Sequence, residues 1–383
     1  MEPIAHLRLV EKSEPPEYDE QTLKAHNENS GKYAAEALRC IGLDKVGSFC
    51  GNIHDLGKAT KKFFDYIQPG NTLRRGEVNH TFAAVRYIFE MSDGIDNEVR
   101  ELLAYAVGAH HGQFDAVNDD HKNGFEHRLT KDGIDYDEAK KNFNKYCFSD
   151  AELKSQFNEA AEQLTEIIAG IRERNPKRSA RQAEEYEFQI SLLARLLLSA
   201  VIEGDRRDTA EFMENMEFPQ VEADWDECLG HIEEKLGKFS NTRPIDRARK
   251  QISDICRAAA EEEPGIFRLN VPTGAGKTLS GLRFAVAHAK AYRKKRIIFT
   301  SPLLSILDQN AKIIREFIGD DSIITEHHSN VALDEDNADE LKRAQLLTEN
   351  WSSPVIITTL VQLLDTLFAG KTSCIRRMHA LCD

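Results

Sequence analysis

The sequence predicts an α + α/β fold, in which a helical domain is followed by a parallel α/β domain. Apolar residues recur at helical spacing through the first part, and after Ile266 short apolar runs alternate with helical segments. Charge also separates the two parts. Residues 1–240 carry 30 basic and 46 acidic side chains, whereas residues 241–383 carry 20 and 18. Because 383 residues suffice for two ordinary domains, we expect domains at 1–240 and 241–383.

Helical periodicity marks the first domain. One stripe at helical spacing comprises Leu23, His26, Tyr33, Ala34, Ala37 and Ile41. The stretch 187–205, EFQISLLARLLLSAVIEGD, is apolar nearly all round, which predicts a helix in the middle of the domain. The stretch 113–150 is polar and rich in turn residues, so we expect an irregular insertion there.

Three short apolar runs predict the strands of the second domain. They are IFRLNV at 266–271, RIIFTS at 296–301 and PVIITT at 354–359, and segments of helical character separate them. Strands that alternate with helices favour a parallel sheet. A basic linker, FSNTRPIDRARKQ, precedes them near Lys238.

Composition excludes several classes of protein. No apolar run is long enough to span a bilayer, and the N-terminal residues lack the basic and apolar regions of a secretory signal. The seven cysteines contain no CxxC pair, so we expect a reduced, cytoplasmic protein without a structural zinc site. We expect no membrane partner. The net charge of −14 also argues against a broadly basic surface, so any contact with nucleic acid must be local or assisted by cations or a partner.

The sequence PTGAGKT at 272–278 predicts a phosphate-binding loop. A glycine-rich turn before a helix points backbone N–H groups at an anion. Lys277 would reach the β- and γ-phosphates and Thr278 would hold Mg²⁺. Val271 departs from the usual pattern, which has Gly or Ala there, and the alternative is a glycine turn without a ligand. The residues expected to bind nucleotide are Thr273, Gly274, Gly276, Lys277 and Thr278.

Histidines and carboxylates recur on apolar helical faces of the first domain. They are His54, which ends a stripe of apolar residues, its neighbour Asp55, and His80, His110, His111 and Asp205. Singly, each is more simply a hydrogen-bonded core residue or a helix cap. Together they would cost several kcal/mol each to bury, unless a divalent cation neutralises the carboxylates and takes the imidazole lone pairs. This donor set suits a transition metal such as Mn, Fe, Co, Ni or Zn, and a metal pair would make the domain a hydrolase of phosphoesters.

These motifs resemble those of the HD phosphohydrolase superfamily. The matching residues are HDLGK at His54–Lys58, His26, His80, HHG at His110–Gly112 and GDRRDT around Asp205. The junction with NVPTGAGKTLSGLRFA at 270–285 resembles the CRISPR-associated nuclease–helicase of type I systems, which fuses an HD nuclease to a superfamily 2 helicase. The runs SPLLSILDQN at 301–310, EHHS at 326–329 and ITTLVQ at 357–362 are similar to later helicase motifs.

The resemblance implies an HD nuclease domain, followed by an incomplete first RecA-like lobe. His26, His54, Asp55 and Asp205 would hold one ion, and Asp55 would bridge to a second held by His80, His110 and His111. Asp55 and Lys58 would be the catalytic residues, with Lys58 contacting phosphate. The implied cofactors are two ions of Mn, Fe, Co or Ni, and ATP with Mg²⁺ in the full-length family member. The implied partners are single-stranded DNA and the Cascade complex with its crRNA.

The family continues into a DExx motif and a second RecA-like lobe, and the printed chain ends at Asp383 before them. We therefore expect this chain alone to hydrolyse ATP poorly or not at all. Two other functions stay open. One is an HD hydrolase of small nucleotides, against which the helicase-like runs after residue 296 argue. The other is a non-catalytic docking fragment with an acidic face.

Overall fold

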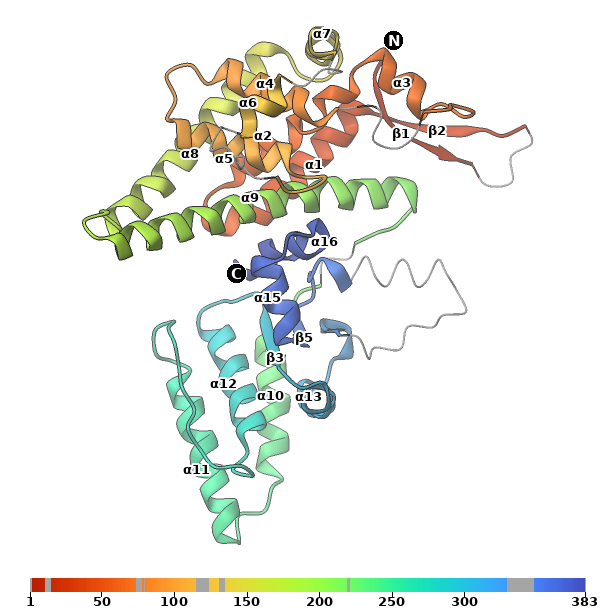
Figure 1. The fold of residues 1–383 in the computed structure, drawn as a ribbon. Helices are drawn as coiled ribbons and strands as arrows, with labels where there is room; N and C mark the ends of the chain where they lie inside the picture. The colour runs from red at the N-terminus through yellow and green to blue at the C-terminus, as the bar shows by residue number, and fades with distance from the viewer. Residues whose placement is uncertain are drawn as a thin grey trace. The chain divides into compact units, whose positions relative to one another are not determined.

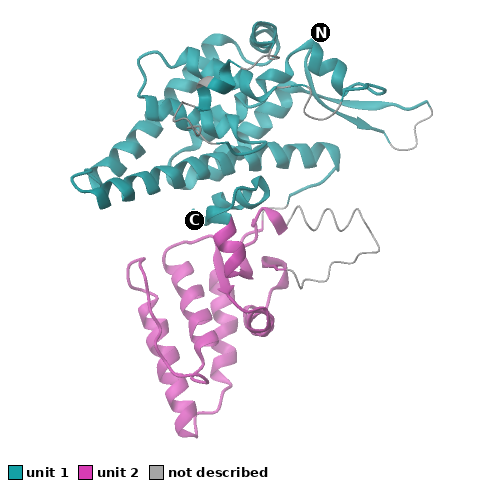
Figure 2. Cartoon of the chain, viewed as in Figure 1, with its two compact units in different colours: residues 1–218, 366–382 teal, residues 219–365, 383 magenta. Residues whose placement is uncertain are grey.

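The chain folds into two compact units in this computed structural model, which describes residues 2–10, 15–73, 78, 80–114, 124–130, 135–218, 221–328 and 348–382. Unit 1 comprises residues 1–218 and 366–382, and unit 2 comprises residues 219–365 (Figures 1 and 2). The predicted fold class is confirmed, since unit 1 is mainly helical and unit 2 contains a parallel sheet. The expected domain boundary at residue 240 stays a prediction.

Unit 1 is a helical unit that opens with a short antiparallel sheet. Its elements are β1 (Ile4–Leu9), β2 (Tyr18–Thr22), α1 (Leu23–Leu38), α2 (Asp44–Ile53), η2 (Leu56–Lys58), α3 (Lys61–Ile67), α4 (Thr81–Met91), α5 (Asn97–Gly108), α6 (Gly124–Leu129), α7 (Tyr136–Tyr146), α8 (Asp150–Arg174), α9 (Ala180–Met213), α16 (Thr372–Ile375) and η4 (Arg376–Leu381). The stretch 187–205 lies within α9, where Leu197, Leu198 and Val201 are buried as predicted.

The stretch 113–150 is less irregular than expected, because α6 and α7 lie within its described part. Tyr136, Ala139 and Phe143 are the buried residues of α7, at helical spacing. Many charged residues lie between these three, so the composition of the stretch did not indicate a helix. None of the described helices combines the length and the apolarity needed to cross a bilayer.

The N-terminal hairpin is an element that the sequence pattern did not predict. β1 and β2 pair antiparallel, with Leu9 opposite Tyr18 and Ile4 opposite Thr22. β2 reads YDEQT and is mostly exposed, so it lacks a clear apolar alternation. The hairpin runs directly into α1, because the side chain of Thr22 caps this helix by accepting a hydrogen bond from the Ala25 N–H.

Glycines allow α1, α2 and α9 to approach each other backbone to backbone. A Cβ added at Gly51 of α2 would lie 2.5 Å from the Cα of Gly31 in α1. A Cβ at Gly204 of α9 would collide with the carbonyl oxygen of Ser30, also in α1. Both approaches are closer than any side chain permits. The backbone of α1 therefore contacts α2 and α9 directly at these two glycines.

Unit 2 has a three-stranded parallel sheet with helices around it. Its elements are α10 (Trp225–Gly237), α11 (Pro244–Ala259), α12 (Lys277–Ala291), β3 (Ile297–Ser301), α13 (Leu304–Ile318), η3 (Asp321–Ile323), β4 (Ile324–His327) and β5 (Val355–Thr359). The helix α15 (Leu360–Phe368) follows β5. The strand order is β3-β5-β4, and both pairs are parallel. Ile297, Val355 and Ile357 are buried in its core with Leu282 and Val286 of α12.

The strand expected at 266–271 is absent, and that prediction was wrong. Ile266 is fully exposed, and Leu269 is 41% exposed. An apolar run forms a strand only where a neighbouring strand pairs with its backbone. Among the described residues, the only strand pairs of unit 2 are those of β5 with β3 and with β4. The other two predicted strands correspond to β3 and β5.

The close contact at Gly51 between α1 and α2 predicts that adding one methyl group there destabilises the protein. Gly51→Ala should lower the free energy of unfolding by about 1–3 kcal/mol, because backbone atoms must move to admit the Cβ. Chemical denaturation measures the change. Gly170→Ala is the matched control, because a Cβ in this part of α8 meets only the end of the Arg174 side chain at 3.6 Å. The control should be neutral or stabilising by up to about 1 kcal/mol, and equal effects would contradict the account.

Candidate metal centre

His54 and Asp55 occupy the turn where α2 ends and η2 begins. Both side chains are fully buried. The Nδ1 atom of His54 lies 2.7 Å from the carbonyl oxygen of Gly51, so this nitrogen donates within its own helix turn. The Nε2 atom of His54 then points away from the helix, and among the described residues it has no hydrogen-bond partner.

A first group of donors forms where α1, α2 and α9 meet. It comprises His26, His54, Asp55 and Asp205, and one ligand atom of each lies within 4.8 Å of the others. The Nε2 atoms of His26 and His54 lie 3.2 and 3.3 Å from Oδ2 of Asp55. The same two atoms lie 3.5 and 3.7 Å from Oδ1 of Asp205. The structure thus brings together four of the predicted ligands.

A second group shares Asp55 with the first. Asp55, His110 and His111 each offer a ligand atom within 4.8 Å of the others. The Nε2 atoms of His110 and His80 lie 3.7 and 3.8 Å from Oδ1 of Asp55. The Nε2 atoms of His80 and His111 are 2.8 Å apart. Asp55 therefore presents Oδ2 to the first group and Oδ1 to the second.

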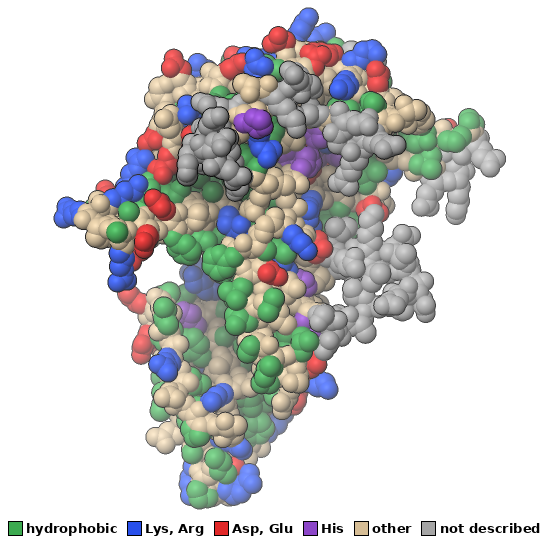
Figure 3. Space-filling view, in the orientation of Figure 1, with side chains coloured by type: hydrophobic (Ala, Val, Ile, Leu, Met, Phe, Trp, Pro, Cys, Tyr) green, Lys and Arg blue, Asp and Glu red, His purple; other side chains and the backbone are tan. Residues whose placement is uncertain are grey.

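The groups differ in their access to solvent. His26, His54 and His110 are buried, whereas His111 is exposed and His80 is partly exposed. On the face drawn in Figure 3, histidine side chains of unit 1 are visible at the surface. A phosphoester could therefore reach the second group from solvent.

The buried polar atoms of the centre fit a divalent cation. In the described part of the chain, Asp55 Oδ1, His54 Nε2 and His110 Nε2 are buried without a hydrogen-bond partner. Each is a lone-pair donor, and a metal ion would satisfy all of them without adding a proton. Imidazole nitrogens mixed with carboxylate oxygens match the preference of Mn, Fe, Co, Ni and Zn better than that of Mg or Ca. The donor set therefore suits two transition-metal ions with Asp55 between them.

Lys58 lies inside the centre as a fixed positive charge. Its Nζ atom is 2.6 Å from Oδ2 of Asp55, and its side chain is 8% exposed. It belongs to η2, one turn after Asp55. An ammonium in this place can offset the charge of a carboxylate or attract a phosphate.

Protonation compensates the buried carboxylates where no ion is bound. Burial lowers the pKa of His26, but hydrogen bonds with Asp205, Asp208 and Asp55 outweigh it and raise this pKa to about 10. Burial opposes the charge on His54 too, and Asp55 with Asp205 raises its pKa to about 9. Burial would raise the pKa of Asp55, but Lys58 and His54 hold it well below the ordinary value.

The more exposed imidazoles behave in the opposite way. Burial lowers the pKa of His80 to about 4, against the attraction of Asp55. His111 has an exposed edge, but the protein around the rest of its ring removes water from it, and this desolvation, together with the neighbouring His110, lowers its pKa to about 3. Both rings are neutral at physiological pH, which is the form of imidazole that binds a metal.

Sequence reasoning missed three residues of this neighbourhood. Asp208 follows Asp205 by one helical turn and hydrogen-bonds His26. The spacing within GDRRDT could have revealed it, because residues three apart share a helix face. His6 and Gln21 lie on the unpredicted hairpin and hydrogen-bond each other. No periodicity in the sequence points to them.

The glycine turn of unit 2 has two glycines in the left-handed region and leads directly into a helix, although no strand precedes it. Gly274 and Gly276 have φ angles of 84° and 87°, which favour glycine, and Lys277 begins α12. The side chain of Thr278 donates to the Asn310 side chain at 3.1 Å. Arg249 Nε of α11 donates to the carbonyl oxygen of Gly274 at 2.9 Å. Thr273, Gly274, Gly276, Lys277 and Thr278 thus lie together at one helix N-terminus.

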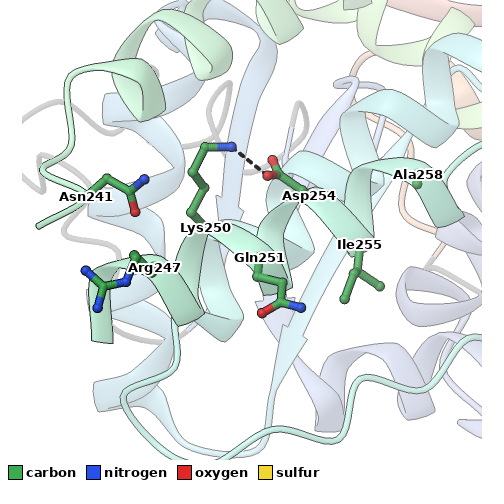
Figure 4. Close-up of a pocket in the computed structure, with 7 residues that line it drawn as sticks. All are labelled: Asn241, Arg247, Lys250, Gln251, Asp254, Ile255 and Ala258. Carbon is green, nitrogen blue, oxygen red and sulfur yellow. Dashed lines mark hydrogen bonds and ion pairs between the residues drawn. The ribbon is translucent and has the colours of Figure 1, made fainter. Parts of the chain in front are cut away.

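An open pocket of about 470 Å³ in unit 2 holds none of the predicted site residues. The residues that line it are Asn241, Arg247, Lys250, Gln251, Asp254, Ile255 and Ala258 (Figure 4). Lys250 Nζ pairs with Asp254 at 2.6 Å, so its charge is already compensated. The pocket and the histidine cluster are therefore separate features, and the residues singled out from the sequence do not line the pocket.

Comparison with known proteins identifies relatives for both units. Residues 21–201 match the family model described as Cas3, HD domain, and residues 241–372 match that described as Type III restriction enzyme, res subunit. The CRISPR-associated nuclease/helicase Cas3 of Haloferax volcanii is 23% identical over 423 residues, which cover 94% of this chain and 44% of that protein.

A crystal structure of T. fusca Cas3 with ATP shares the fold. Its ATP complex aligns with a TM-score of 0.50 and 18% identity, and covers 100% of this chain and 46% of that one. Its ADP complex has a TM-score of 0.48 and 18% identity, and covers 98% of this chain and 46% of that one. The chain thus spans less than half the length of these relatives.

The raised pKa values of His26 and His54 predict how the stability of metal-free protein depends on pH. Both imidazoles have a pKa of 6.5 when unfolded and of about 10 and 9 when folded. The folded state binds more protons between these values, so the stabilisation is complete below pH 6.5 and is lost as the pH rises toward 10. Urea unfolding of chelator-treated protein at several pH values should show this decline.

His54→Gln serves as the control for this pH profile, because it removes the contribution of one imidazole and should flatten the decline. A free energy of unfolding that is constant or rises from pH 6.5 to pH 10 would contradict the assigned protonation.

Proposed function

Because this chain is homologous to the Cas3 nuclease/helicases, with a Cas3 HD domain followed by a helicase-like domain, we propose that unit 1 is a metal-dependent nuclease that cleaves single-stranded DNA. The observation that carries the proposal is the placement of Asp55. One of its oxygens faces His26 and His54, and the other faces His110 and His80. A carboxylate shared in this way is suited to bridging two ions.

Each predicted ligand has a role in the proposed centre. His26, His54, Asp55 and Asp205 would hold one ion, and Asp55 with His80, His110 and His111 would hold the other. When bound, two divalent ions activate water and stabilise charge at a phosphodiester. The protein fixes the donors beforehand, since backbone carbonyls anchor the Nδ1 atoms of His54 and His110.

Lys58 adds a positive charge at the same place. In the structure its ammonium pairs with Oδ2 of Asp55. We assign it a second contact, with the phosphate of DNA, for which its ammonium would leave Asp55. The chain of methylene groups between Cα and Nζ gives the ammonium the reach for this change of partner. Asp55 and Lys58 are then the residues nearest the reaction.

The substrate contact is proposed to be local. The first 240 residues carry 46 acidic against 30 basic side chains, which disfavours a long electrostatic track for DNA. Recruitment by the Cascade complex with its crRNA would supply the strand directly and remove the need for such a track. All seven cysteines are free thiols, which fits the reducing cytoplasm where this would occur.

Unit 2 is proposed to bind ATP with Mg²⁺ at its glycine turn. The two glycines with positive φ and the start of α12 at Lys277 support this role. Thr278 already has a polar neighbour in Asn310, which orients its hydroxyl.

Substitution of Asp55 tests the nuclease proposal directly. Asp55→Ala should lower cleavage of a single-stranded oligonucleotide in Mn²⁺ or Co²⁺ by more than about 100-fold. Loss of a direct ligand should exceed the 10–100-fold effect typical of residues that only orient one. Asp44→Ala is the control, because Asp44 starts the same helix and hydrogen-bonds Gln163 outside the centre. Circular dichroism verifies that both variants fold.

The same assay includes deoxynucleoside triphosphates. Hydrolysis of these small substrates without cleavage of the oligonucleotide would reject the nuclease in favour of a nucleotide hydrolase. Cleavage by Asp55→Ala at the wild-type rate would reject the metal centre itself.

Lys277 tests the nucleotide site independently. Lys277→Ala should weaken equilibrium binding of Mg-ATP by about tenfold or more, roughly 1.4 kcal/mol, because a contact with the β- and γ-phosphates is lost. Lys290→Ala is the control, since this lysine lies on the same helix and pairs with Asp226. Equal affinities for the two variants would show that the turn holds no phosphate. Cleavage of DNA in unit 1 should be unchanged in both.

A further inference from the structure

Asp208 is a buried carboxylate next to the proposed centre that neither group of ligands includes. It lies on α9 three residues after Asp205, so both side chains leave the helix on the same side. Its side chain is 2% exposed. Among the residues described, its one ion-pair partner is His26. Such a buried charge needs a reason, because its burial costs free energy unless the surroundings compensate it.

Three donors converge on Asp208. His26 Nδ1 lies 2.5 Å and Gln21 Nε2 lies 2.8 Å from its Oδ2 atom. Asn29 Nδ2 lies 2.7 Å from its Oδ1 atom. An ionised carboxylate only accepts hydrogen bonds, so the His26 ring must carry a proton on Nδ1. Nε2, which is 3.2 Å from Asp55 Oδ2, is then the nitrogen left for an ion.

His26 differs in this respect from the other buried imidazoles. His54 and His110 donate from Nδ1 to backbone carbonyl oxygens three residues earlier, which belong to their own turns. A backbone carbonyl cannot be removed by substitution. His26 instead relies on a side chain from another helix. Its orientation therefore depends on one carboxylate, and that carboxylate depends on its own donors.

The N-terminal hairpin is part of this support. Gln21 lies on β2, and its Oε1 atom is 2.8 Å from His6 Nδ1 on β1. The His6 ring also packs edge-on against the His26 ring, with centroids 4.8 Å apart. β1 packs against both α1 and α9, which carry His26 and Asp208. The hairpin thus contacts His26 directly, through His6, and indirectly, through Gln21 and Asp208.

We propose that Asp208 is a positioning residue that holds His26 with its proton on Nδ1 and its Nε2 directed at the metal, and that Gln21 and Asn29 fix Asp208 in turn. The inference rests on the proposed metal centre and adds to it a support that reaches from α9 to the hairpin. Mutation of a carboxylate that orients a ligating histidine commonly lowers metal affinity by about 10–100-fold.

Asp208→Asn tests the role without a change of size. The amide nitrogen of the new side chain can take the place of Oδ2, where it would face the N–H donors of His26 and Gln21. Alternatively, it can take the place of Oδ1, where it would face the N–H donor of Asn29. Either arrangement loses a hydrogen bond, and the first favours a proton on Nε2. We expect Co²⁺ affinity, measured by titration of the purified chain, to fall by about 10–100-fold. The visible absorption spectrum of the Co²⁺ form should change as well.

Glu203→Gln is the matched control. Glu203 lies on the same helix, is also buried and pairs with Arg376 at 2.6 Å, a partner outside the proposed centre. Its substitution should lower thermal stability, yet leave the Co²⁺ affinity and spectrum unchanged. Gln21→Leu is a second variant in case Asp208→Asn does not fold. It removes one donor to Asp208 and should weaken Co²⁺ binding several-fold.

The outcomes separate this inference from the function on which it rests. If the wild-type chain does not bind Co²⁺, or if Asp55→Ala binds it equally well, the metal centre and the inference both fail. If the wild-type chain binds Co²⁺ and Asp55→Ala does not, the centre stands. Wild-type affinity and spectrum in Asp208→Asn and Gln21→Leu would then overturn the positioning role alone. A loss of affinity in Glu203→Gln equal to that in Asp208→Asn would also overturn it.

Discussion

The polar centre of unit 1 is arranged around the negative charge of one buried carboxylate, which neighbouring positive groups must compensate. Asp55 is fully buried, and imidazoles from four separate segments and the ammonium of Lys58 surround it. A lone carboxylate in such a place would be too costly to keep ionised. Nearby positive charge holds the pKa of Asp55 low, so the charge persists. The same surroundings make it able to bind cations that replace protons.

Close backbone packing makes this concentration of polar groups possible. Gly51 and Gly204 let α2 and α9 lie against the backbone of α1 without intervening side chains. Apolar residues of the same helices, such as Phe49, Leu23 and Leu197, form the core around the centre. Helices carry His26 and Asp205, and His54 caps the end of α2, which suits a site whose donors must hold fixed distances. The imidazoles nearest solvent lie at helix ends, since His80 caps the start of α4 and His111 lies in the turn that follows α5.

The proposed ligands could be singled out from the sequence because their residue types are unusual on apolar helical faces. His54, His110 and Asp205 each continue an apolar stripe, and burial of several such groups requires a common cause. The supporting residues were not predictable in this way. Gln21 and His6 lie on a polar hairpin without clear alternation, and Asp208 follows two arginines that suggest a solvent-exposed turn of helix. Their role exists only in the tertiary structure.

The run 266–271 shows the opposite kind of error, because the sequence predicted an element that the structure lacks. Its apolar composition predicted a strand, but strand formation depends on a paired neighbour that local sequence does not specify. β3 and β5 succeed because they pair with each other in register from Ile297 and Val355 onward. The glycine turn that follows this run still has its left-handed backbone, since Gly274 and Gly276 determine it locally.

Anomalous diffraction from crystals of the chain grown with Mn²⁺ or Co²⁺ tests the central claim most directly. The account predicts two peaks, one among His26, His54, Asp55 and Asp205, and one among Asp55, His80, His110 and His111. Asp55 would contact both ions. Crystals that show no ion at Asp55, with its carboxylate still paired to Lys58 and the histidines at saturating metal, would contradict it.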